Sequence, residues 1–302
     1  MSITQDIRDA FSRRDNALNQ LIIINVLVFG VLIILKAIFF IAQSSSMYVL
    51  IMRQLALSSD PMVVLRHPWT LLSYAFVHSI DSPFHILFNM LNLYWFGQLI
   101  REYLGDRRLV SLYVLGALAG AVVFLLAYNF LTVFQGQVGI PLIGASAAVT
   151  AIIVAAATKL PNYTFMLFLF GPVKIKWIAA VVVVVLSIAP IYGGNPGGGL
   201  SHLGGALLGF LFIKQLDAGR DLGQPVVATG EWLGRLFQPR PAMKVTHRSP
   251  VSVGRPASAA GKAVPSATPP EEVDLILDKI SRSGYESLSK EEKQKLFRAS
   301  QQ

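Results

Sequence analysis

Residues 135–159 have the sequence QGQVGIPLIGASAAVTAIIVAAATK, in which two different kinds of polypeptide meet. From Ser146 onward the residues are small and apolar, as in a helix buried in a membrane. The preceding run contains three glycines and one proline, which favour irregular backbone. Irregular backbone at membrane depth is tolerated only where protein buries it or where it lines a water-filled cavity. The stretch therefore predicts a wet cavity, open to the outside, with Ser146 at its floor.

The length of the predicted helix locates Ser146 within the membrane. Thirteen steps separate Ser146 from Lys159, so at 1.5 Å per residue the helix is roughly 20 Å long. The hydrocarbon core of a bilayer is about 30 Å thick, so the outer end of this helix lies well below the surface. The same measure places His202 and Asn89 about 18 Å above the inner ends of their helices, with His85 one turn further out. We therefore expect these polar residues to lie in one layer.

The composition of the whole chain is that of a membrane protein. Its 302 residues are 53% apolar and 14% charged, and the mean hydropathy is +0.54. We therefore predict an all-α, polytopic fold with a bundle of six membrane-spanning helices. The predicted spans are 21–41, 84–100, 109–134, 146–158, 177–192 and 200–216.

Basic residues indicate how these spans are oriented. They precede the first span, follow the sixth, and lie between the second and third and between the fourth and fifth, whereas the alternate loops hold only Arg53 and Arg66. The positive-inside rule therefore places both termini in the cytoplasm of a multi-pass protein of the cell (inner) membrane. The net charge of +9 can also indicate nucleic-acid binding, but charges at helix ends favour membrane topology, and no nucleic acid is predicted as a partner. The inside residues are Arg8, Arg13, Arg14, Arg101, Arg107, Arg108, Lys159, Lys174, Lys176, Lys214 and Arg220.

The membrane domain is predicted over residues 21–217, after a polar cytoplasmic segment at 1–20. Its first external connection, about 42–83, is long and itself apolar. Such a segment is expected to lie in the membrane interface rather than to extend into water.

The C-terminal third of the chain has a different composition. Residues 218–270 are rich in Pro, Ala, Ser, Gly and Arg, which predicts a flexible basic linker. Residues 271–302 regain helical periodicity, and Ser289 with Glu292 has the spacing of a capping box. We therefore predict a small cytoplasmic helical hairpin. Its apolar stripe consists of Val273, Ile276, Leu277 and Ile280.

The polar residues of the buried layer include a nucleophile and a base. A serine becomes a good nucleophile when a neutral imidazole takes its proton, and Ser146 and His202 can form that pair if their helices touch. The Ser146 amide, His85 and Asn89 are candidate hydrogen-bond donors to an oxyanion. Small residues on both helices favour close contact. They are Gly144, Ala147, Ala148 and Ala151 on one helix, and Gly205, Ala206 and Gly209 on the other.

Several other kinds of site are excluded by the residues present. No Asp or Glu occurs from residue 107 to 216, which removes an aspartyl dyad, an H-E-x-x-H metal site and an acidic third member of a triad within those spans. The chain has no cysteine, so thiol nucleophiles and cysteine-held metals are excluded. His78, His85 and His202 are an alternative metal set, although neither a metal nor another cofactor is predicted. Each polar residue also has a plain structural interpretation, the serine in helix packing and the histidines bonded to neighbouring backbone.

Three motifs resemble those of the rhomboid intramembrane serine proteases, of the bacterial kind with a six-helix core and a cytoplasmic C-terminal extension. They are HILFNMLNLYWFGQLIREYLG (85–105), GAS (144–146) and SHLGGALLG (201–209). The resemblance implies that Ser146 is the nucleophile and His202 the general base. It implies oxyanion donors at His85, Asn89 and the Ser146 amide, and helix contacts at Gly144, Gly205 and Gly209. The implied partners are membrane lipids and single-pass transmembrane substrates, which the family cuts near the outer leaflet.

Two residues depart from the family pattern. Where the family has G-x-S-G, Ala147 follows the serine, and its methyl group can crowd the oxyanion site. One turn later Thr150 replaces the usual aromatic that stacks on the base histidine, so another group must orient the imidazole.

Two other functions stay open. The main alternative is a catalytically inactive relative that binds and escorts membrane proteins. A small transporter or channel is the second, against which stands the lack of acidic residues in the third to sixth spans.

Overall fold

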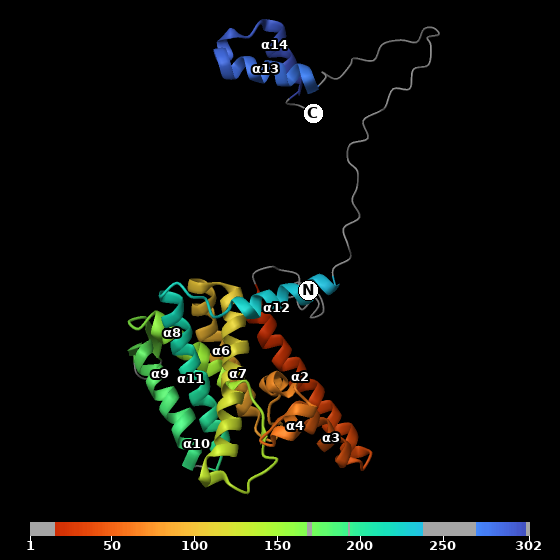
Figure 1. The fold of residues 1–302 in the computed structure, drawn as a ribbon, viewed down its shortest axis with the longest axis vertical. Coiled ribbons are helices and arrows are strands. Elements are labelled where there is room, and N and C mark those ends of the chain that lie inside the picture. Colours follow the sequence, from red (N-terminus) through yellow and green to blue (C-terminus); the bar gives the residue numbers. More distant parts are fainter. Residues whose placement is uncertain (1–15, 168–170, 193, 238–269, 300–302) are drawn as a thin grey trace, which may run out of the picture. The chain divides into compact units, whose positions relative to one another are not determined.

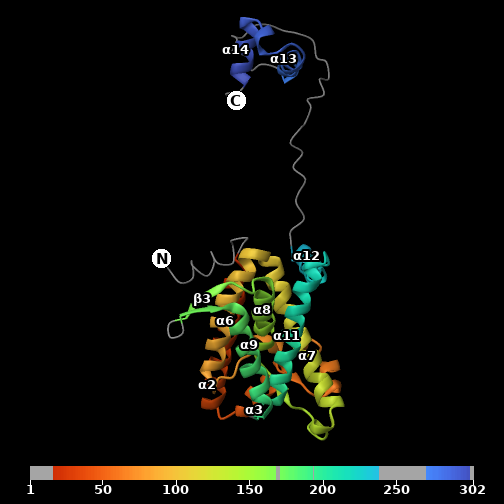
Figure 2. The same ribbon diagram turned by 90° about the vertical axis from the view of Figure 1, so that its left-hand side faces the viewer.

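The structure is a computed structural model that describes residues 16–167, 171–192, 194–237 and 270–299. The chain divides into two compact units, residues 1–239 and 240–302, and each is described by itself. The first unit is a bundle of long helices that lie side by side (Figures 1 and 2). These helices are α2 (Ala17–Ile41), α6 (Pro83–Leu104), α7 (Asp106–Phe130), α8 (Ser146–Lys159), α9 (Ile175–Val183), which continues through a π-helical turn at Val184–Ile188 into α10 (Ala189–Tyr192), and α11 (Pro196–Asp217).

This arrangement confirms the all-α bundle and its six helical segments. Within the described ranges, α2, α7, α9 with α10, and α11 are long and apolar enough to cross a membrane, and α8 is a shorter apolar helix of 14 residues. Four helix ends differ from prediction by four residues. α2 begins at Ala17 and α11 at Pro196, ahead of the predicted 21 and 200, and α6 and α7 end at Leu104 and Phe130 instead of at 100 and 134. α6 continues past its first charged residue to Leu104, because the chain leaves the helix only at Gly105, whose positive φ of 85° suits a glycine. α7 ends at Phe130, followed by extended backbone at Leu131.

The short helix α8 lies at the centre of the bundle. It packs against α6, α7, α9 and α11, and most of its residues are buried. Close packing depends on glycines in the neighbouring helices. A Cβ at Gly116 of α7 would lie 2.6 Å from the Ala151 Cβ, and one at Gly205 or Gly209 of α11 would overlap a carbonyl oxygen of α8. The expected contact between the fourth and sixth spans is therefore present, with the small residues where the helices meet.

The first connection, which follows α2, folds into short elements against the bundle (Figure 1). The Tyr74 hydroxyl donates a 2.7 Å hydrogen bond to the Ala117 carbonyl of α7, which fixes the end of this connection to the core. Several of its apolar side chains are exposed, among them Leu65 (74%) and Trp69 (51%), in keeping with an interfacial segment. The elements are α3 (Ser45–Leu55), β1 (Leu57–Ser58), which pairs antiparallel with β2 (Pro141–Leu142), α4 (Pro61–Arg66), α5 (Thr70–Ser73) and a 3₁₀ turn at Tyr74–Phe76.

Two elements were not expected from the sequence. An antiparallel hairpin of β3 (Thr164–Leu167) and β4 (Gly171–Lys174) joins α8 to α9. The prediction of a flexible linker over 218–270 is wrong for its first part, because Gln224–Phe237 form the amphipathic helix α12. α12 packs on the N-terminal end of α7, where Arg107 pairs with Glu231 at 3.4 Å. The linker residues 238–269 lie outside the described part of the chain.

The second unit contains the predicted helical hairpin, α13 (Pro270–Ser283) and α14 (Lys290–Ala299). The capping box is formed, because the Ser289 main-chain amide donates to the Glu292 carboxylate at 2.7 Å and the Glu292 amide donates to the Ser289 hydroxyl at 3.3 Å. In the predicted stripe, Ile276 is buried but Leu277 is 49% exposed.

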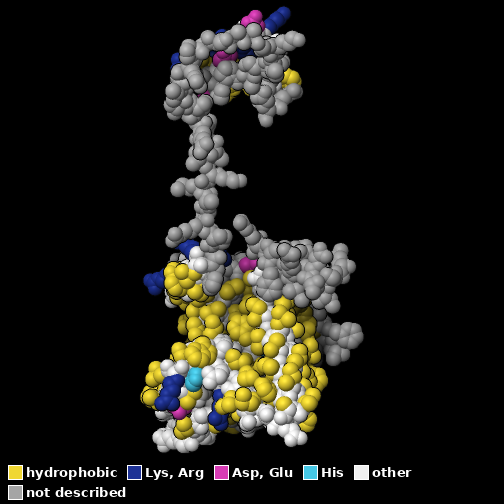
Figure 3. Space-filling model, turned by 90° about the vertical axis from the view of Figure 1, so that its right-hand side faces the viewer, with side chains coloured by type: hydrophobic (Ala, Val, Ile, Leu, Met, Phe, Trp, Pro, Cys, Tyr) yellow, Lys and Arg dark blue, Asp and Glu magenta, His cyan; other side chains and the backbone are white. Residues whose placement is uncertain are grey.

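The surface of the bundle is largely apolar. Figure 3 shows one face, where hydrophobic side chains cover the middle of the unit and the visible lysine and arginine side chains lie toward its ends. Examples of exposed apolar residues are Val31 (54%) and Phe40 (76%) on α2 and Trp177 (61%) on α9. An apolar surface of this extent is expected of helices that face lipid.

Candidate active site

Ser146 is the first residue of α8, and a glycine brings the backbone before it close to α6. Gly144 has φ of 124°, a conformation that L side chains rarely adopt. A Cβ there would lie 2.8 Å from Nε2 of His85 and 3.5 Å from Oγ of Ser146. The Gly144 amide donates to the Tyr74 carbonyl at 3.0 Å, which holds the strand in place. Gly144 thus lets Ser146 and His85 share one small space.

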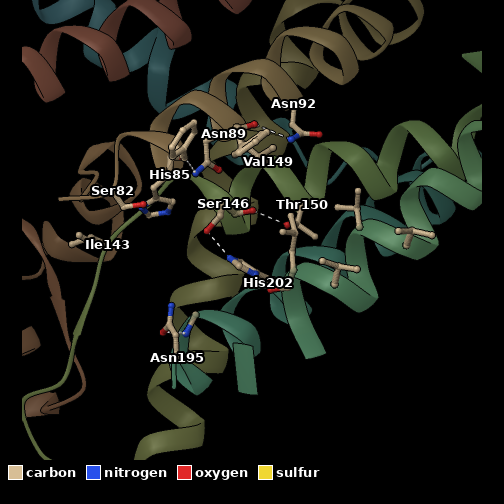
Figure 4. A pocket seen from close by; sticks show the side chains of 17 residues that line it. Ser82, His85, Asn89, Asn92, Ile143, Ser146, Val149, Thr150, Asn195 and His202 are labelled. Atoms are coloured by element: carbon tan, nitrogen blue, oxygen red, sulfur yellow. Dashed lines mark hydrogen bonds between the residues drawn. The ribbon is translucent and has the colours of Figure 1, made fainter. Parts of the chain in front are cut away.

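The side chains of Ser146 and His202 are hydrogen-bonded across the contact between α8 and α11. Oγ of Ser146 lies 2.6 Å from Nε2 of His202 (Figure 4). The two helices approach this closely because Gly205, three residues after the histidine, faces the Ala147 carbonyl without a side chain. A serine that donates its proton to an unprotonated imidazole nitrogen is the arrangement of an activated nucleophile.

The other ring nitrogen of His202 bonds to the protein backbone. Nδ1 is hydrogen-bonded to the main-chain carbonyl oxygen of Leu186, in the π-helical turn between α9 and α10. A carbonyl only accepts, so Nδ1 carries the proton and Nε2 is free to accept from Ser146. Thr150 has a separate role, because its Oγ1 donates to the Ser146 carbonyl at 2.7 Å. Sequence reasoning missed Leu186, since a main-chain atom leaves no residue signature at its own position.

His85 and Asn89 lie on the same face of α6 and point into the same space as Ser146 (Figure 4). Nδ2 of Asn89 donates to the His85 carbonyl at 2.7 Å, within its own helix. The His85 ring contacts the edge of the His78 ring, with 5.2 Å between centroids. His78 is fully buried and its ring nitrogens have no hydrogen-bond partner within the described structure. No group of three or more potential metal ligands occurs among the residues that the structure describes.

These polar groups line a cavity of about 680 Å³ between α6, α8, α9 and α11. Phe84 and Phe88 of α6 and Val181 and Val185 of α9 form apolar walls. Ser146, His202, His85 and Asn89, which come from three separate helices, line this one cavity.

The methyl group of Ala147 does not point into this cavity. It is buried against α7, where a Cβ at Gly120 would lie only 2.5 Å from the Ala147 Cβ. Gly120 thus provides the space that Ala147 fills. A glycine on the neighbouring helix α7 thus accommodates the alanine that departs from the family pattern. The expected crowding of the oxyanion site by the Ala147 methyl group is not observed.

Comparison with known proteins agrees with this geometry. A family model described as the Rhomboid domain matches residues 65–216, which include every residue of the layer. The chain belongs to the rhomboid family. As a rhomboid-family protein with apolar helices of this length, it is a multi-pass membrane protein.

One curated relative and a second family model extend the comparison. The chain is 35% identical over 161 residues to RHOMBOID-like protein 12, mitochondrial, of Arabidopsis thaliana. The match covers 50% of this chain and 47% of the relative, so the chain spans about half the length of that protein. Residues 267–302 match a family of unknown function, DUF6576, which coincides with the C-terminal hairpin.

Proposed function

We propose that this rhomboid-family protein is an intramembrane serine endopeptidase that cleaves transmembrane segments of other membrane proteins. The observation that carries the proposal is the 2.6 Å hydrogen bond between Ser146 Oγ and His202 Nε2, in a cavity with apolar walls. The proposed active residues are a dyad, because no Asp or Glu is among the residues that line the cavity and Nδ1 of His202 bonds to a main-chain carbonyl.

The geometry supports acyl transfer in two steps. In the first, Ser146 Oγ attacks the scissile carbonyl while Nε2 of His202 takes the hydroxyl proton, and the protonated imidazole then gives this proton to the leaving amine. An ester links Ser146 to the N-terminal part of the substrate. In the second step His202 takes a proton from water, the resulting hydroxide attacks the ester, and the proton returns to Ser146.

Three groups are suited to stabilise the oxyanion that forms in each step. The Ser146 amide is at the N-terminus of α8, where the first N–H groups have no partner within the helix. The His85 ring lies beside Gly144, close to the Ser146 hydroxyl. Nδ2 of Asn89 donates one hydrogen to the His85 carbonyl, and its second hydrogen is available to a substrate oxygen.

We further propose that the substrates are single-pass membrane proteins cut near the outer leaflet of the cell (inner) membrane. α8 has 14 residues, which is about 20 Å of helix, so Ser146 lies below one surface of a bilayer whose core is about 30 Å thick. With both termini cytoplasmic, as the distribution of basic residues favours, that surface is the outer one. A segment that unwinds readily can place its backbone at this depth.

Cleavage of a reporter transmembrane substrate in lipid nanodiscs tests the proposal. We expect product from the wild type and none from Ser146→Ala or His202→Ala. Ser45→Ala and His67→Ala, outside the cavity, serve as matched controls and should cleave normally. A fluorophosphonate probe should label Ser146 and should lose that label in His202→Ala. Equal product from the wild type and both dyad variants would contradict the proposal. Capture of the reporter without cleavage or labelling would support the inactive escort instead.

A further inference from the structure

We infer that the main-chain carbonyl of Leu186, which Pro190 deprives of its α-helical donor, positions His202 as the base. The inference rests on the proposed function of the Ser146–His202 pair. It assigns to a backbone atom the role that a carboxylate has in a catalytic triad, which is to hold the imidazole in one orientation and one tautomer.

A proline four residues after Leu186 changes the hydrogen bonds of its helix. In an α-helix the carbonyl of residue 186 accepts from the N–H of residue 190. Residue 190 is a proline and has no N–H, so the Leu186 carbonyl cannot be satisfied in that way. The helix departs from α geometry at this place, because the Ala189 amide bonds to the Val184 carbonyl five residues back. The Leu186 oxygen therefore lacks its α-helical donor, lies in a π-helical turn, and is hydrogen-bonded to Nδ1 of His202.

Close packing at Gly199 of α11 brings the Leu186 carbonyl near His202. Gly199 lies three residues before His202, so the two residues share a face of α11. A Cβ at Gly199 would overlap the Ser187 carbonyl and would lie 2.9 Å from Cγ1 of Ile191. The π-helical turn can reach the histidine only because this glycine has no side chain.

The carbonyl group of Pro190 is bonded to the start of α11. The Pro190 carbonyl accepts a 3.0 Å hydrogen bond from the Asn195 amide. The Asn195 side chain in turn caps α11 by accepting from the Gly198 amide at 3.0 Å. The segment that carries the Leu186 carbonyl and the helix that carries His202 are thus joined at the start of α11.

The consequence for the reaction follows from the donor and acceptor roles. With Nδ1–H bonded to Leu186, the lone pair of neutral His202 is on Nε2, which faces Ser146. When His202 takes the serine proton, the Nδ1–H bond becomes charge-assisted and stronger. The carbonyl therefore helps most in the state in which the imidazole is charged. It also supplies the orientation that an aromatic residue would give at position 150, where this chain has threonine.

Nitrogen-15 NMR of the full chain, labelled at its five histidines, tests the inference without reference to activity. The His202 signals are assigned by their loss in His202→Gln. In wild type we expect neutral His202 with Nδ1 protonated and Nε2 unprotonated. Pro190→Ala restores an N–H that competes for the Leu186 carbonyl, and this variant should show a mixture of both tautomers. Pro172→Ala makes the same substitution at an exposed residue of β4, and its His202 spectrum should match that of the wild type.

Kinetics provide the second readout. We expect kcat of Pro190→Ala to fall about 3- to 10-fold, the range for loss of one hydrogen bond, with KM little changed. An Nε2-protonated neutral tautomer in wild type would overturn the inference without any variant, even if Pro190→Ala failed to fold. An unchanged tautomer and unchanged kcat in folded Pro190→Ala would overturn it as well. If wild type has the expected tautomer but cleaves nothing, the proposed function fails and the positioning contact stands.

Discussion

The contact between α8 and α11 gives the sharpest test of how packing controls the site, through the substitution Gly205→Ala. A Cβ at Gly205 would lie 2.9 Å from the carbonyl carbon of Ala147, and the carbonyl oxygen is nearer still. Ordinary contacts of this kind are 3.4–4 Å, so the helices must separate by at least about 0.5 Å for the carbon and more for the oxygen. Because His202 is on the same helix, one turn away, this displacement acts directly on its bond to Ser146.

A separation of this size is large compared with the tolerance of the hydrogen bond. The Ser146–His202 bond is 2.6 Å, and lengthening it by about 1 Å takes it beyond hydrogen-bonding distance. A misplacement of about 1 Å in an active site can lower the rate by 10²-fold. We therefore expect Gly205→Ala to lose about two orders of magnitude in kcat, and overpacking to lower the free energy of unfolding by about 1–3 kcal/mol.

The assay compares Gly205→Ala with Gly30→Ala. Gly30 is also a glycine of a long apolar helix, but a Cβ there meets nothing within 4 Å. In Gly30→Ala, cleavage and probe labelling should equal those of the wild type, and stability should be equal or slightly higher because alanine is the better helix former. Gly205→Ala with more than half of wild-type cleavage and an unchanged melting temperature would refute the reasoning.

Three further predictions follow from buried packing and from the C-terminal hairpin. Gly120→Ala should destabilise the bundle by about 1–3 kcal/mol, and adding Ala147→Gly should recover part of the loss, because the two methyl positions are 2.5 Å apart. A double-mutant cycle of thermal unfolding measures the coupling between the two sites, and strict additivity of the two effects would contradict the contact. Tyr113→Phe should lower the free energy of unfolding by about 1–3 kcal/mol, because the buried Tyr113 hydroxyl donates to the Ala75 carbonyl and accepts from the buried Asn25 side-chain amide. The control Tyr94→Phe, at a residue that is 44% exposed, should have no effect. The main-chain amide of the capping box lowers the pKa of Glu292, so its stabilisation of the hairpin is present above the ordinary glutamate pKa and is lost as the pH falls through the lowered value. The protection of α14 amides against exchange, measured relative to an unfolded chain at the same pH, should fall only in that acidic range, and equal protection at all pH values would contradict it.

The elements that could be predicted are those governed by regular geometry. The rise of a helix is constant, so counting residues from Lys159, Lys214 and Arg101 predicted that Ser146, His202 and Asn89 lie together, and all three line one cavity. The capping box at Ser289 was equally local, because its two hydrogen bonds join residues three apart. In both cases the relevant distances lie along one helix and do not depend on how helices pack.

The features that could not be predicted depend on contacts with a second helix or were hidden because the amino-acid composition was averaged over a long segment. The composition of 218–270 concealed α12, whose apolar residues Trp232, Leu233 and Leu236 occupy only part of that range. The direction of the Ala147 methyl is set by Gly120, which lies on another helix. The Leu186 carbonyl is a main-chain atom, and only a proline four residues later marks it in the sequence.

The contact between Leu186 and His202 also satisfies two groups that would otherwise be unpaired in an apolar setting. An orphan carbonyl at membrane depth is unfavourable, and so is an imidazole N–H without an acceptor. Because each satisfies the other, no buried carboxylate and no desolvated charge is needed to pair them. His202→Ala must then have an effect that Ser146→Ala does not, since it leaves the Leu186 carbonyl without its donor as well as removing the base. We expect the unfolding free energy of His202→Ala to fall by about 1–3 kcal/mol more than that of Ser146→Ala, measured by thermal unfolding in the same lipid. Equal stability of the two variants would mean that the carbonyl has another partner, and that Pro190 is not compensated by the histidine.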